Sequence, residues 1–243
     1  MSLIPKSVGI IIDGNRRWAQ YNNLPSIEGH RKGAQNLKKI VVRAIKLGIQ
    51  ELNIFGLSSE NWSRGTTEIS YLLSLIERYI RSEITEMHIN NIVFNIVGDK
   101  NKFNKSLNNL MVNAENITKN NTGMKFNLAL NYGGKMDFIY TCKSIVEKVQ
   151  KNEILLNDIN ENTIKNNLLS NKVSEIDLLI RTSGEYRISN FMLWQLAYSE
   201  MYFTKTLWPD FWEDEFEKAI DCFAQRNRRY GSNIDKNSKI EKK

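Results

Sequence analysis

The 243-residue chain contains few cysteines, histidines and prolines, and it has no long hydrophobic run. Cys142 and Cys222 are far apart and form no Cys-x-x-Cys pair, so the sequence predicts neither a disulfide framework nor a zinc site and favours a reducing compartment. The N-terminus has no basic segment followed by an apolar stretch, so we expect no signal peptide. No run approaches the roughly 20 apolar residues of a membrane-spanning helix. We therefore expect a cytoplasmic protein.

Several common motifs are also absent. There is no Gly-x-x-x-x-Gly-Lys-Ser/Thr loop, no Gly-x-Gly-x-x-Gly after the first expected strand and no Gly-x-Ser-x-Gly turn, so P-loop kinases, dinucleotide oxidoreductases and α/β-hydrolases lose support. The net charge of +7 admits nucleic acid, anionic lipid or a phosphorylated small molecule as a partner. The lysines are scattered and the aromatic residues do not alternate with an arginine stripe, so we expect no nucleic-acid binding.

Short β-branched runs alternate with longer segments of helical period. This alternation predicts an α/β fold with a mainly parallel central sheet flanked by helices. We expect one domain over residues 1–231, followed by a basic, flexible tail over 232–243. The expected strands are 8–12, 51–57, 92–97, 125–130, 177–180 and 201–203, and the expected helices are 32–47, 66–90, 101–119, 134–151, 161–169 and 213–228.

The first expected strand ends in the run Asp13-Gly14-Asn15-Arg16-Arg17-Trp18. In open α/β sheets, ligands bind in the crevice beyond the carboxyl ends of the strands. There a carboxylate can hold a hard cation, a glycine lets backbone N–H groups approach an anion, and two arginines can bind phosphate oxygens. The run could instead hold an aspartate that caps the next helix beside solvated arginines, and both interpretations stay open on this run alone.

The second expected strand ends in Ser58-Ser59-Glu60-Asn61-Trp62-Ser63-Arg64, which is more polar than a simple connection requires. Alternatively, Ser59 or Asn61 caps a helix and Glu60 pairs with Arg64 on the surface. Because such clusters follow two strands, a binding site is favoured over two unrelated loops.

Further polar residues fit the same kind of site. Arg181 and Arg187 follow the fifth expected strand at a spacing that suits a doubly charged diphosphate. His30 lies at the start of the first long helix, where an anion is favoured. Gly133-Gly134 either cradles a phosphate or forms a tight turn. Glu200 follows a stretch expected to be mostly buried, so its carboxylate needs a metal or an arginine as a partner.

These motifs resemble the cis-prenyltransferase family, and within it most closely the bacterial synthases of undecaprenyl diphosphate. The resemblance runs in order from about residue 7 to residue 231. It is carried by Asp13-Gly14-Asn15-x-Arg17-Trp18, Gly29-His30, Ser58-x-Glu60-Asn61-Trp62-x-Arg64, Asn131-Tyr132-Gly133-Gly134, Arg181-Thr182-Ser183-Gly184-Glu185-x-Arg187-x-Ser189-x-Phe191-x-Leu193-Trp194-Gln195 and Leu207-Trp208-Pro209-Asp210-Phe211.

The resemblance implies a cis-prenyltransferase fold with a hydrophobic tunnel, one wall of which is the helix that begins at Thr66. It implies a Mg²⁺-dependent enzyme that condenses isopentenyl diphosphate successively onto farnesyl diphosphate or another allylic diphosphate. It also implies a homodimer whose product, undecaprenyl diphosphate, is the precursor of a lipid carrier for cell-wall glycans. Because this product is apolar, peripheral contact with the inner face of the plasma membrane is expected.

The resemblance also implies a role for each motif residue. Asp13 is the central Mg²⁺ ligand and assists catalysis, Glu200 is a second metal ligand that reaches across the dimer, and Asn61 is the family's proposed proton acceptor. The C-terminal element Arg229-Tyr230-Gly231 is expected to reach the partner subunit's site. The substrate-binding residues implied are Gly14, Asn15, Arg16, Arg17, Trp18 and His30 for the allylic diphosphate, Ser58, Ser59, Glu60, Trp62 and Arg64 around the reaction centre, and Arg181, Arg187, Ile188 and Ser189 for isopentenyl diphosphate.

The chain departs from the family pattern at three places. Ser26 stands where the family usually has an arginine, Arg16 stands where bacterial members often have glycine, and Gly56-Leu57 replaces the commoner Ala-Phe. We hypothesise that Arg16 supplies the charge missing at Ser26. Two alternatives to a long-chain synthase stay open: a same-fold enzyme of shorter product or irregular coupling, and a non-catalytic partner subunit, against which the retained polar motifs argue.

Overall fold

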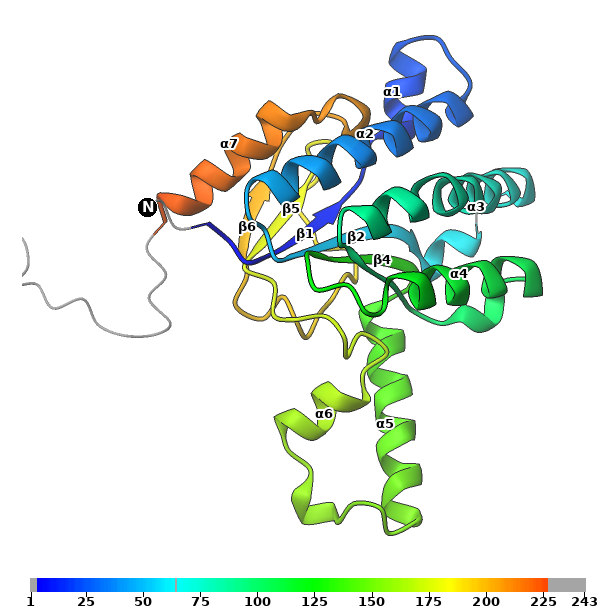
Figure 1. Ribbon diagram of the computed structural model, residues 1–243, viewed down its shortest axis with the longest axis vertical. Helices are drawn as coiled ribbons and strands as arrows, with labels where there is room; N and C mark the ends of the chain where they lie inside the picture. Colours follow the sequence, from blue (N-terminus) through cyan, green and yellow to red (C-terminus); the bar gives the residue numbers. More distant parts are fainter. Residues whose placement is uncertain (1–3, 64, 227–243) are drawn as a thin grey trace, which may run out of the picture.

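The computed structural model describes residues 4–63 and 65–226, and its centre is one sheet of six parallel strands (Figure 1). The strand order is β3-β4-β2-β1-β5-β6, and every adjacent pair is parallel. The strands are β1 (Ser7–Ile11), β2 (Glu51–Ser58), β3 (Val93–Val97), β4 (Lys125–Tyr132), β5 (Leu178–Arg181) and β6 (Glu200–Phe203). All six expected strands, and the mainly parallel α/β class, are therefore confirmed, with strand ends within two residues of the prediction.

Seven α-helices lie in the described ranges. They are α1 (Asn15–Tyr21), α2 (Ser26–Lys46), α3 (Thr66–Ile89), α4 (Lys105–Thr118), α5 (Gly134–Gln150), α6 (Glu161–Asn167) and α7 (Glu213–Ala224). The short 3₁₀ helices are η1 (Ser59–Ser63), η2 (Lys100–Lys102), η3 (Leu156–Asp158) and η4 (Trp208–Asp210).

The helices differ from the prediction at three main places. Helix α1 was not expected, because Ala19 is its only buried residue and the segment therefore has no hydrophobic period. The helix expected over 101–119 is divided, because the side chain of Asn104 accepts a hydrogen bond from the Leu107 backbone N–H and starts α4 there. The predicted helix over 32–47 begins earlier, directly after Pro25.

Helices cover the sheet unequally. The larger core packs α2, α3, α4 and α7 against one face of the sheet. On the other face, Phe55 stacks on Phe191 with ring centroids 4.6 Å apart, and residues 173–196 supply most of the cover. Helices α5 and α6 project away from the body (Figure 1). Within residues 4–63 and 65–226, no helix combines the length and the apolar character needed to cross a bilayer.

The register of the sheet positions the polar clusters. Ile11 of β1 is level with Phe55 of β2 and with Arg181 of β5. Because parallel strands end at the same edge, the residues that follow β1, β2 and β5 come together there. This edge of the sheet holds the site described next.

Candidate active site

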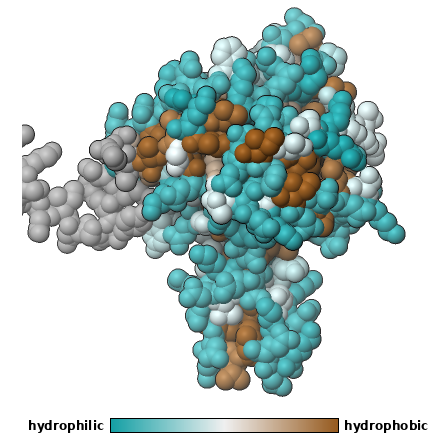
Figure 2. Space-filling model, in the orientation of Figure 1, coloured by the Kyte–Doolittle hydropathy of each residue, from teal (hydrophilic) through white to brown (hydrophobic). Residues whose placement is uncertain are grey.

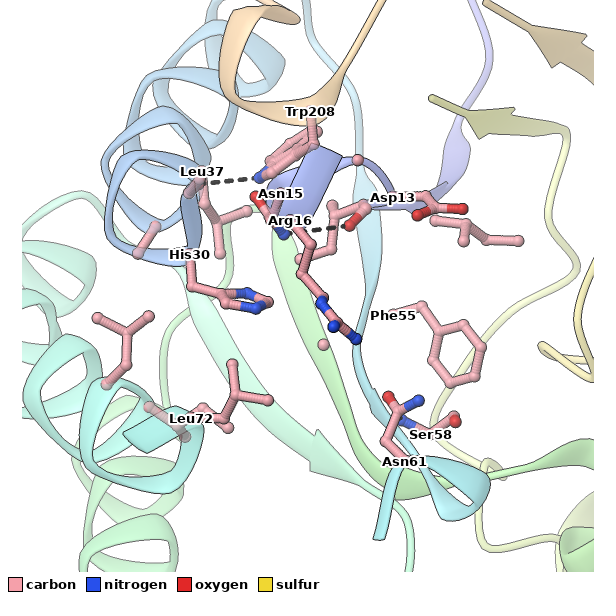
Figure 3. A pocket seen from close by; sticks show the side chains of 18 of the residues that line it. Asp13, Asn15, Arg16, His30, Leu37, Phe55, Ser58, Asn61, Leu72 and Trp208 are labelled. Atoms are coloured by element: carbon pink, nitrogen blue, oxygen red, sulfur yellow. Dashed lines mark hydrogen bonds between the residues drawn. The ribbon is translucent and has the colours of Figure 1, made fainter. Parts of the chain in front are cut away.

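One large cavity of about 610 Å³ opens at the carboxyl edge of the sheet. One end of its lining is polar and carries four arginines and a histidine against a single carboxylate. The rest is largely apolar and lies between α2, α3 and β4 (Figure 3). The polar lining comprises Asp13, Gly14, Asn15, Arg16, Arg17, Gln20, His30, Ser58, Asn61, Arg181, Arg187 and Ser189, and the apolar lining includes Ala34, Leu37, Phe55, Gly56, Leu72, Leu75, Ile76, Tyr79, Leu128 and Leu130.

Asp13 lies at the polar end, two residues beyond β1. Its Oδ2 atom accepts a hydrogen bond from Arg181 Nη2 at 3.0 Å and lies 3.8 Å from Arg17 Nη2. Its backbone is fixed by Thr182, whose hydroxyl donates to the Asp13 carbonyl at 2.6 Å. The carboxylate nevertheless keeps a third of its surface exposed. Asp13 is therefore held in place while one side of it stays open to a ligand.

Gly14 starts α1 with a φ of 108°, in the left-handed region that disfavours other residues. A Cβ atom at this position would lie 3.0 Å from Leu207 Cδ2 and from Ser183 Cβ. Both constraints require glycine here. The turn that it makes sends Asn15 and Arg16 into the cavity directly after Asp13.

The segment after β5 supplies two arginines in different roles. Arg181 is almost fully buried, and its Nη1 atom donates to the Arg187 carbonyl at 2.5 Å and to Ser189 Oγ at 2.6 Å. Arg187 is mostly exposed and pairs with Glu185. Arg17 donates to the Ser183 carbonyl at 2.9 Å and lies 3.2 Å from Glu185. Arg181 thus shapes the loop, while Arg187 and Arg17 present charge to solvent and to a ligand.

Three residues from three helices meet on the opposite side of the cavity. Glu68 of α3 lies 3.8 Å from Arg16 Nη1 and 3.7 Å from His30 Nε2. Figure 3 shows the Arg16 guanidinium reaching into the space between His30 and Asn61. A cation from α1 and an imidazole from α2 therefore face the same space as the arginines after β5.

Helix η1 carries Asn61 into the cavity. The Oδ1 atom of Asn61 accepts a hydrogen bond from the Ser58 backbone N–H at 3.1 Å. Because this contact uses the carbonyl oxygen, the amide NH₂ group is the part left to face a ligand. Asn61 therefore offers a hydrogen-bond donor to the cavity.

Glu60 lies just outside this lining and joins η1 to the segment after β5. Its Oε1 atom accepts a hydrogen bond from Asn190 Nδ2 at 2.8 Å. Partial burial tends to raise the pKa of Glu60, but hydrogen bonds from Asn190, its own backbone, Ser58 and Ser59 outweigh burial and lower it overall. Glu60 is therefore a connecting carboxylate, and its partner Asn190 lies beside the site at a position that the sequence did not single out.

Several residues expected at the site do not line the cavity. Trp18 donates from Nε1 to Asp210 at 2.9 Å and so joins α1 to η4, and Trp62 donates from Nε1 to Asn131 at 2.8 Å and so joins η1 to β4. Ser59, Glu60 and Ile188 lie beside the cavity wall without forming it. Arg64 and Arg229-Tyr230-Gly231 lie outside the described residues.

Within one chain, Glu200 lies at the amino end of the parallel strands, whereas Asp13 follows the carboxyl end of β1. It opens β6 and is level with Leu178, the first residue of β5. Its carboxylate pairs with Arg226 Nη1 at 2.8 Å, which gives it the arginine partner expected for a carboxylate at this position. Asp13 and Glu200 of the same chain therefore do not share a ligand.

The chain matches the family described as "Putative undecaprenyl diphosphate synthase" over residues 11–231. It is 47% identical over 228 residues to the ditrans,polycis-undecaprenyl-diphosphate synthase of Haemophilus influenzae, covering 94% of this chain and 95% of the relative. The chain is 46% identical over 228 residues to the synthase of the same name from Vibrio parahaemolyticus, covering 94% of this chain and 91% of that relative.

A solved structure has the same fold. The lavandulyl diphosphate synthase of Lavandula x intermedia, in complex with dimethylallyl diphosphate, superposes with a TM-score of 0.91 at 38% identity, covering 94% of this chain and 98% of that one. The expected cis-prenyltransferase fold is confirmed. This chain belongs to the undecaprenyl diphosphate synthase family of prenyltransferases.

Proposed function

We propose that this protein condenses isopentenyl diphosphate successively onto farnesyl diphosphate and releases undecaprenyl diphosphate, the precursor of a lipid carrier for cell-wall glycans. The observation that carries the proposal is a single cavity with a cationic end and an apolar end. A prenyl diphosphate has the same two parts, a charged head and an apolar chain. The full names of the two bacterial relatives end in "(2E,6E)-farnesyl-diphosphate specific", which supports farnesyl diphosphate as the starter.

The reaction makes one carbon–carbon bond and breaks one carbon–oxygen bond in each cycle. The allylic diphosphate leaves C1 of the prenyl chain, C4 of isopentenyl diphosphate bonds to that carbon, and a proton leaves C2. Residues of this chain would hold both diphosphates, so that positioning and electrostatics supply most of the catalysis. Arg16, Arg17 and His30 would hold the allylic group, and Arg187 and Ser189 the other.

The donor set at Asp13 fits Mg²⁺ as the family resemblance requires. Mg²⁺ is commonly bound by one or two carboxylates together with substrate phosphates. Asp13 offers a fixed, partly exposed carboxylate at the cationic end of the cavity, and no cluster of three metal-binding side chains is found in the part of the chain that the structure describes. Bound there, the ion would neutralise the leaving diphosphate. Asp13 would hold it together with diphosphate oxygens.

We further propose a homodimer in which Glu200 approaches the partner subunit's site. Glu200 is on β6, an edge strand of the sheet, and is remote from Asp13 of its own chain. Ile139, Tyr140 and Val146 of α5 are each at least half exposed, and Figure 2 shows apolar side chains on the projection formed by α5 and α6. Exposed apolar surface of this kind is typical of a subunit interface. Peripheral membrane contact is proposed only because the product is apolar.

Incorporation of labelled isopentenyl diphosphate tests the proposal. Purified protein is incubated with Mg²⁺ and farnesyl diphosphate, and the products are sized. We expect a ladder that reaches about 55 carbons, and an Asp13→Asn variant should lose about a hundredfold or more of the rate. Asp99→Asn is the matched control, because Asp99 also follows a strand at this edge but does not line the cavity.

Other outcomes separate the alternatives. A product that stops after one or a few additions would favour a short-chain or irregular-coupling enzyme, an option supported by the likeness to a lavandulyl diphosphate synthase. No incorporation with farnesyl, geranyl or dimethylallyl diphosphate would contradict the proposal and favour a non-catalytic partner subunit.

A further inference from the structure

Three segments of the chain meet at Asn190, which lies beside the cavity and is not part of its lining. They are η1, which follows β2, the start of α5, which follows β4, and the segment after β5. Helix η1 supplies Asn61 to the cavity wall, and the segment after β5 supplies Arg187 and Ser189. A residue that joins these segments can therefore set the geometry of the site from outside it.

Both oxygen atoms of Asn190 accept hydrogen bonds from the first turn of α5. Its backbone carbonyl accepts from the Gly134 N–H at 2.7 Å, and its side-chain Oδ1 accepts from the Lys135 N–H at 2.9 Å. The N-cap position of α5 is Gly133, which has no side chain to cap the helix. Asn190 therefore satisfies two of the N–H groups that a helix leaves without partners at its start.

The NH₂ group of the Asn190 amide faces η1. Because α5 uses Oδ1, the other side of the amide is the donor, and Nδ2 donates to Glu60 Oε1 at 2.8 Å. Glu60 directly precedes Asn61 in the chain. Asn190 directly follows Ser189, whose Oγ atom accepts a hydrogen bond from the buried Arg181. One contact therefore joins the sequence neighbours of two residues that line the cavity.

Gly133 leaves the space in which this contact forms. A Cβ atom on Gly133 would lie 2.6 Å from Ser59 Oγ and 2.7 Å from Asn190 Nδ2. The φ of Gly133 is −162°, an extended conformation that any residue can adopt, so the requirement for glycine is steric. The sequence left open whether the two glycines cradle a phosphate or form a tight turn. In the structure, the place of a side chain on Gly133 is taken by Ser59 and Asn190.

We propose that Asn190 is a positioning residue that holds η1 against the segment after β5, so that Asn61 and Ser189 reach their working positions together. This inference rests on the proposed function, in which Arg187 and Ser189 bind isopentenyl diphosphate. The allylic diphosphate would instead be held by residues of α1 and α2, elements that the Asn190 contacts do not join. Loss of the link should therefore affect isopentenyl diphosphate and the bond-forming step and spare the binding of the allylic substrate.

Asn190→Asp tests the link. Aspartate keeps an acceptor for the Lys135 N–H and tolerates the left-handed φ of 64° at this position. It removes the donor, however, and sets two carboxylates against each other. We expect kcat/KM for isopentenyl diphosphate to fall by about tenfold or more, through both a higher KM and a lower kcat. The KM for farnesyl diphosphate should change little.

Reversal of donor and acceptor separates a positioning role from general damage to the fold. In Asn190→Asp/Glu60→Gln, the new amide at position 60 can donate to the new carboxylate at position 190, and the net charge of the pair is unchanged. We expect this double variant to recover most of the kcat/KM that Asn190→Asp loses. Glu60→Gln alone should have a small effect, because its side-chain oxygen can still accept from Asn190.

Asn91→Asp is the matched control. Asn91 also has a positive φ, of 58°, and its side chain also makes two hydrogen bonds, both to Thr122, at 3.0 Å from Nδ2 and at 2.9 Å to Oδ1. It precedes β3 at the amino end of the sheet and does not line the cavity. We expect wild-type kinetics in this variant, even where its melting temperature falls.

Hydrogen exchange reports on the link without turnover. The backbone N–H groups of Ser59–Ser63 should exchange faster in Asn190→Asp than in wild type, and the double variant should restore the wild-type rate. Should thermal melting show that Asn190→Asp does not fold, Glu60→Ala takes its place, because it removes the acceptor and leaves the contacts to α5 intact.

The outcomes distinguish two failures. A wild-type protein that makes no prenyl product contradicts the proposed function, while the exchange measurement still reports on the link. Equal kinetics and equal exchange in wild type and Asn190→Asp, or no recovery in the double variant, would overturn the inference itself.

Discussion

The nearly buried Arg181 and the partly exposed Asp13 are joined by a 3.0 Å hydrogen bond between Nη2 and Oδ2. The same guanidinium donates to the Arg187 carbonyl and to Ser189 Oγ. One buried cation therefore orients the proposed metal ligand and the loop that carries Arg187. The contact links the proposed binding sites of the two diphosphates.

Arg181→Lys tests this link. Lysine keeps the charge but cannot reproduce the fixed geometry of the guanidinium, so at least one buried acceptor loses its donor, at a cost of roughly 1–3 kcal/mol. We expect a lower melting temperature. We also expect a strong loss of kcat when both diphosphate substrates are saturating. The exposed Arg187→Lys should cost little stability. Wild-type kinetics in Arg181→Lys would contradict the proposed coupling.

Gly14→Ala should lower both stability and activity. Alanine at a φ of 108° costs about 1–3 kcal/mol, and its Cβ would press against Leu207 and Ser183. Gly48→Ala is the matched control, because Gly48 also has a positive φ but a Cβ there meets nothing within 4 Å. Thermal unfolding should show the larger loss in Gly14→Ala, and only this variant should lose turnover. Equal effects of the two variants would contradict a role for close packing at Gly14.

The sequence predicted the sheet and the location of the site better than it predicted individual side-chain directions. Runs such as Ile10-Ile11-Ile12 indicate strands, and parallel strands necessarily bring Asp13, Ser58 and Arg181 to one edge. The direction of an indole depends on distant partners, so Trp18 and Trp62 were expected at the site although they bind Asp210 and Asn131.

The cavity wall was only partly predictable for a similar reason. Leu72, Ile76 and Tyr79 were expected on one apolar face of α3, but the same face continues into Ile80 and Ile84, which are buried core. Helical period alone does not separate core from cavity, because both require apolar residues. The separation depends on how closely α2 approaches α3, which the sequence does not show.

Asn61→Asp distinguishes two roles of the amide. If Asn61 donates its NH₂ group to a diphosphate, aspartate removes the donor and adds a repelling charge, and kcat/KM should fall by about a hundredfold or more. If residue 61 instead accepts the proton, aspartate is the better base and activity should survive or rise. The contact from the Ser58 N–H favours the first result. Steady-state kinetics over a range of pH decides between them.

Asp137 should make stability depend on pH. Burial raises the pKa of this carboxyl, although hydrogen bonds from Ser170, the Leu169 N–H and Tyr132 oppose the shift. The pKa of Asp137 is thus higher in the folded protein than in the unfolded chain. The carboxyl therefore contributes its full stability at a pH below its pKa in the unfolded chain, and this contribution is lost as the pH rises through its pKa in the folded protein. The stability of wild type relative to Asp137→Asn should therefore decrease over that window, as measured by denaturant unfolding. A constant difference across the window would contradict this prediction.

Arg16→Gln tests whether Arg16 supplies the charge that Ser26 lacks. Arg16 lines the cavity near His30, and Ser26 precedes His30 by one helical turn, so an arginine at either position can reach the same part of the cavity. We expect the variant to bind farnesyl diphosphate about tenfold more weakly, which corresponds to about 1.4 kcal/mol. Arg31→Gln is the matched control, because Arg31 is on α2 outside the cavity and pairs with Glu28. The double variant Arg16→Gln/Ser26→Arg should recover most of the affinity, whereas unchanged binding in Arg16→Gln would exclude the compensation.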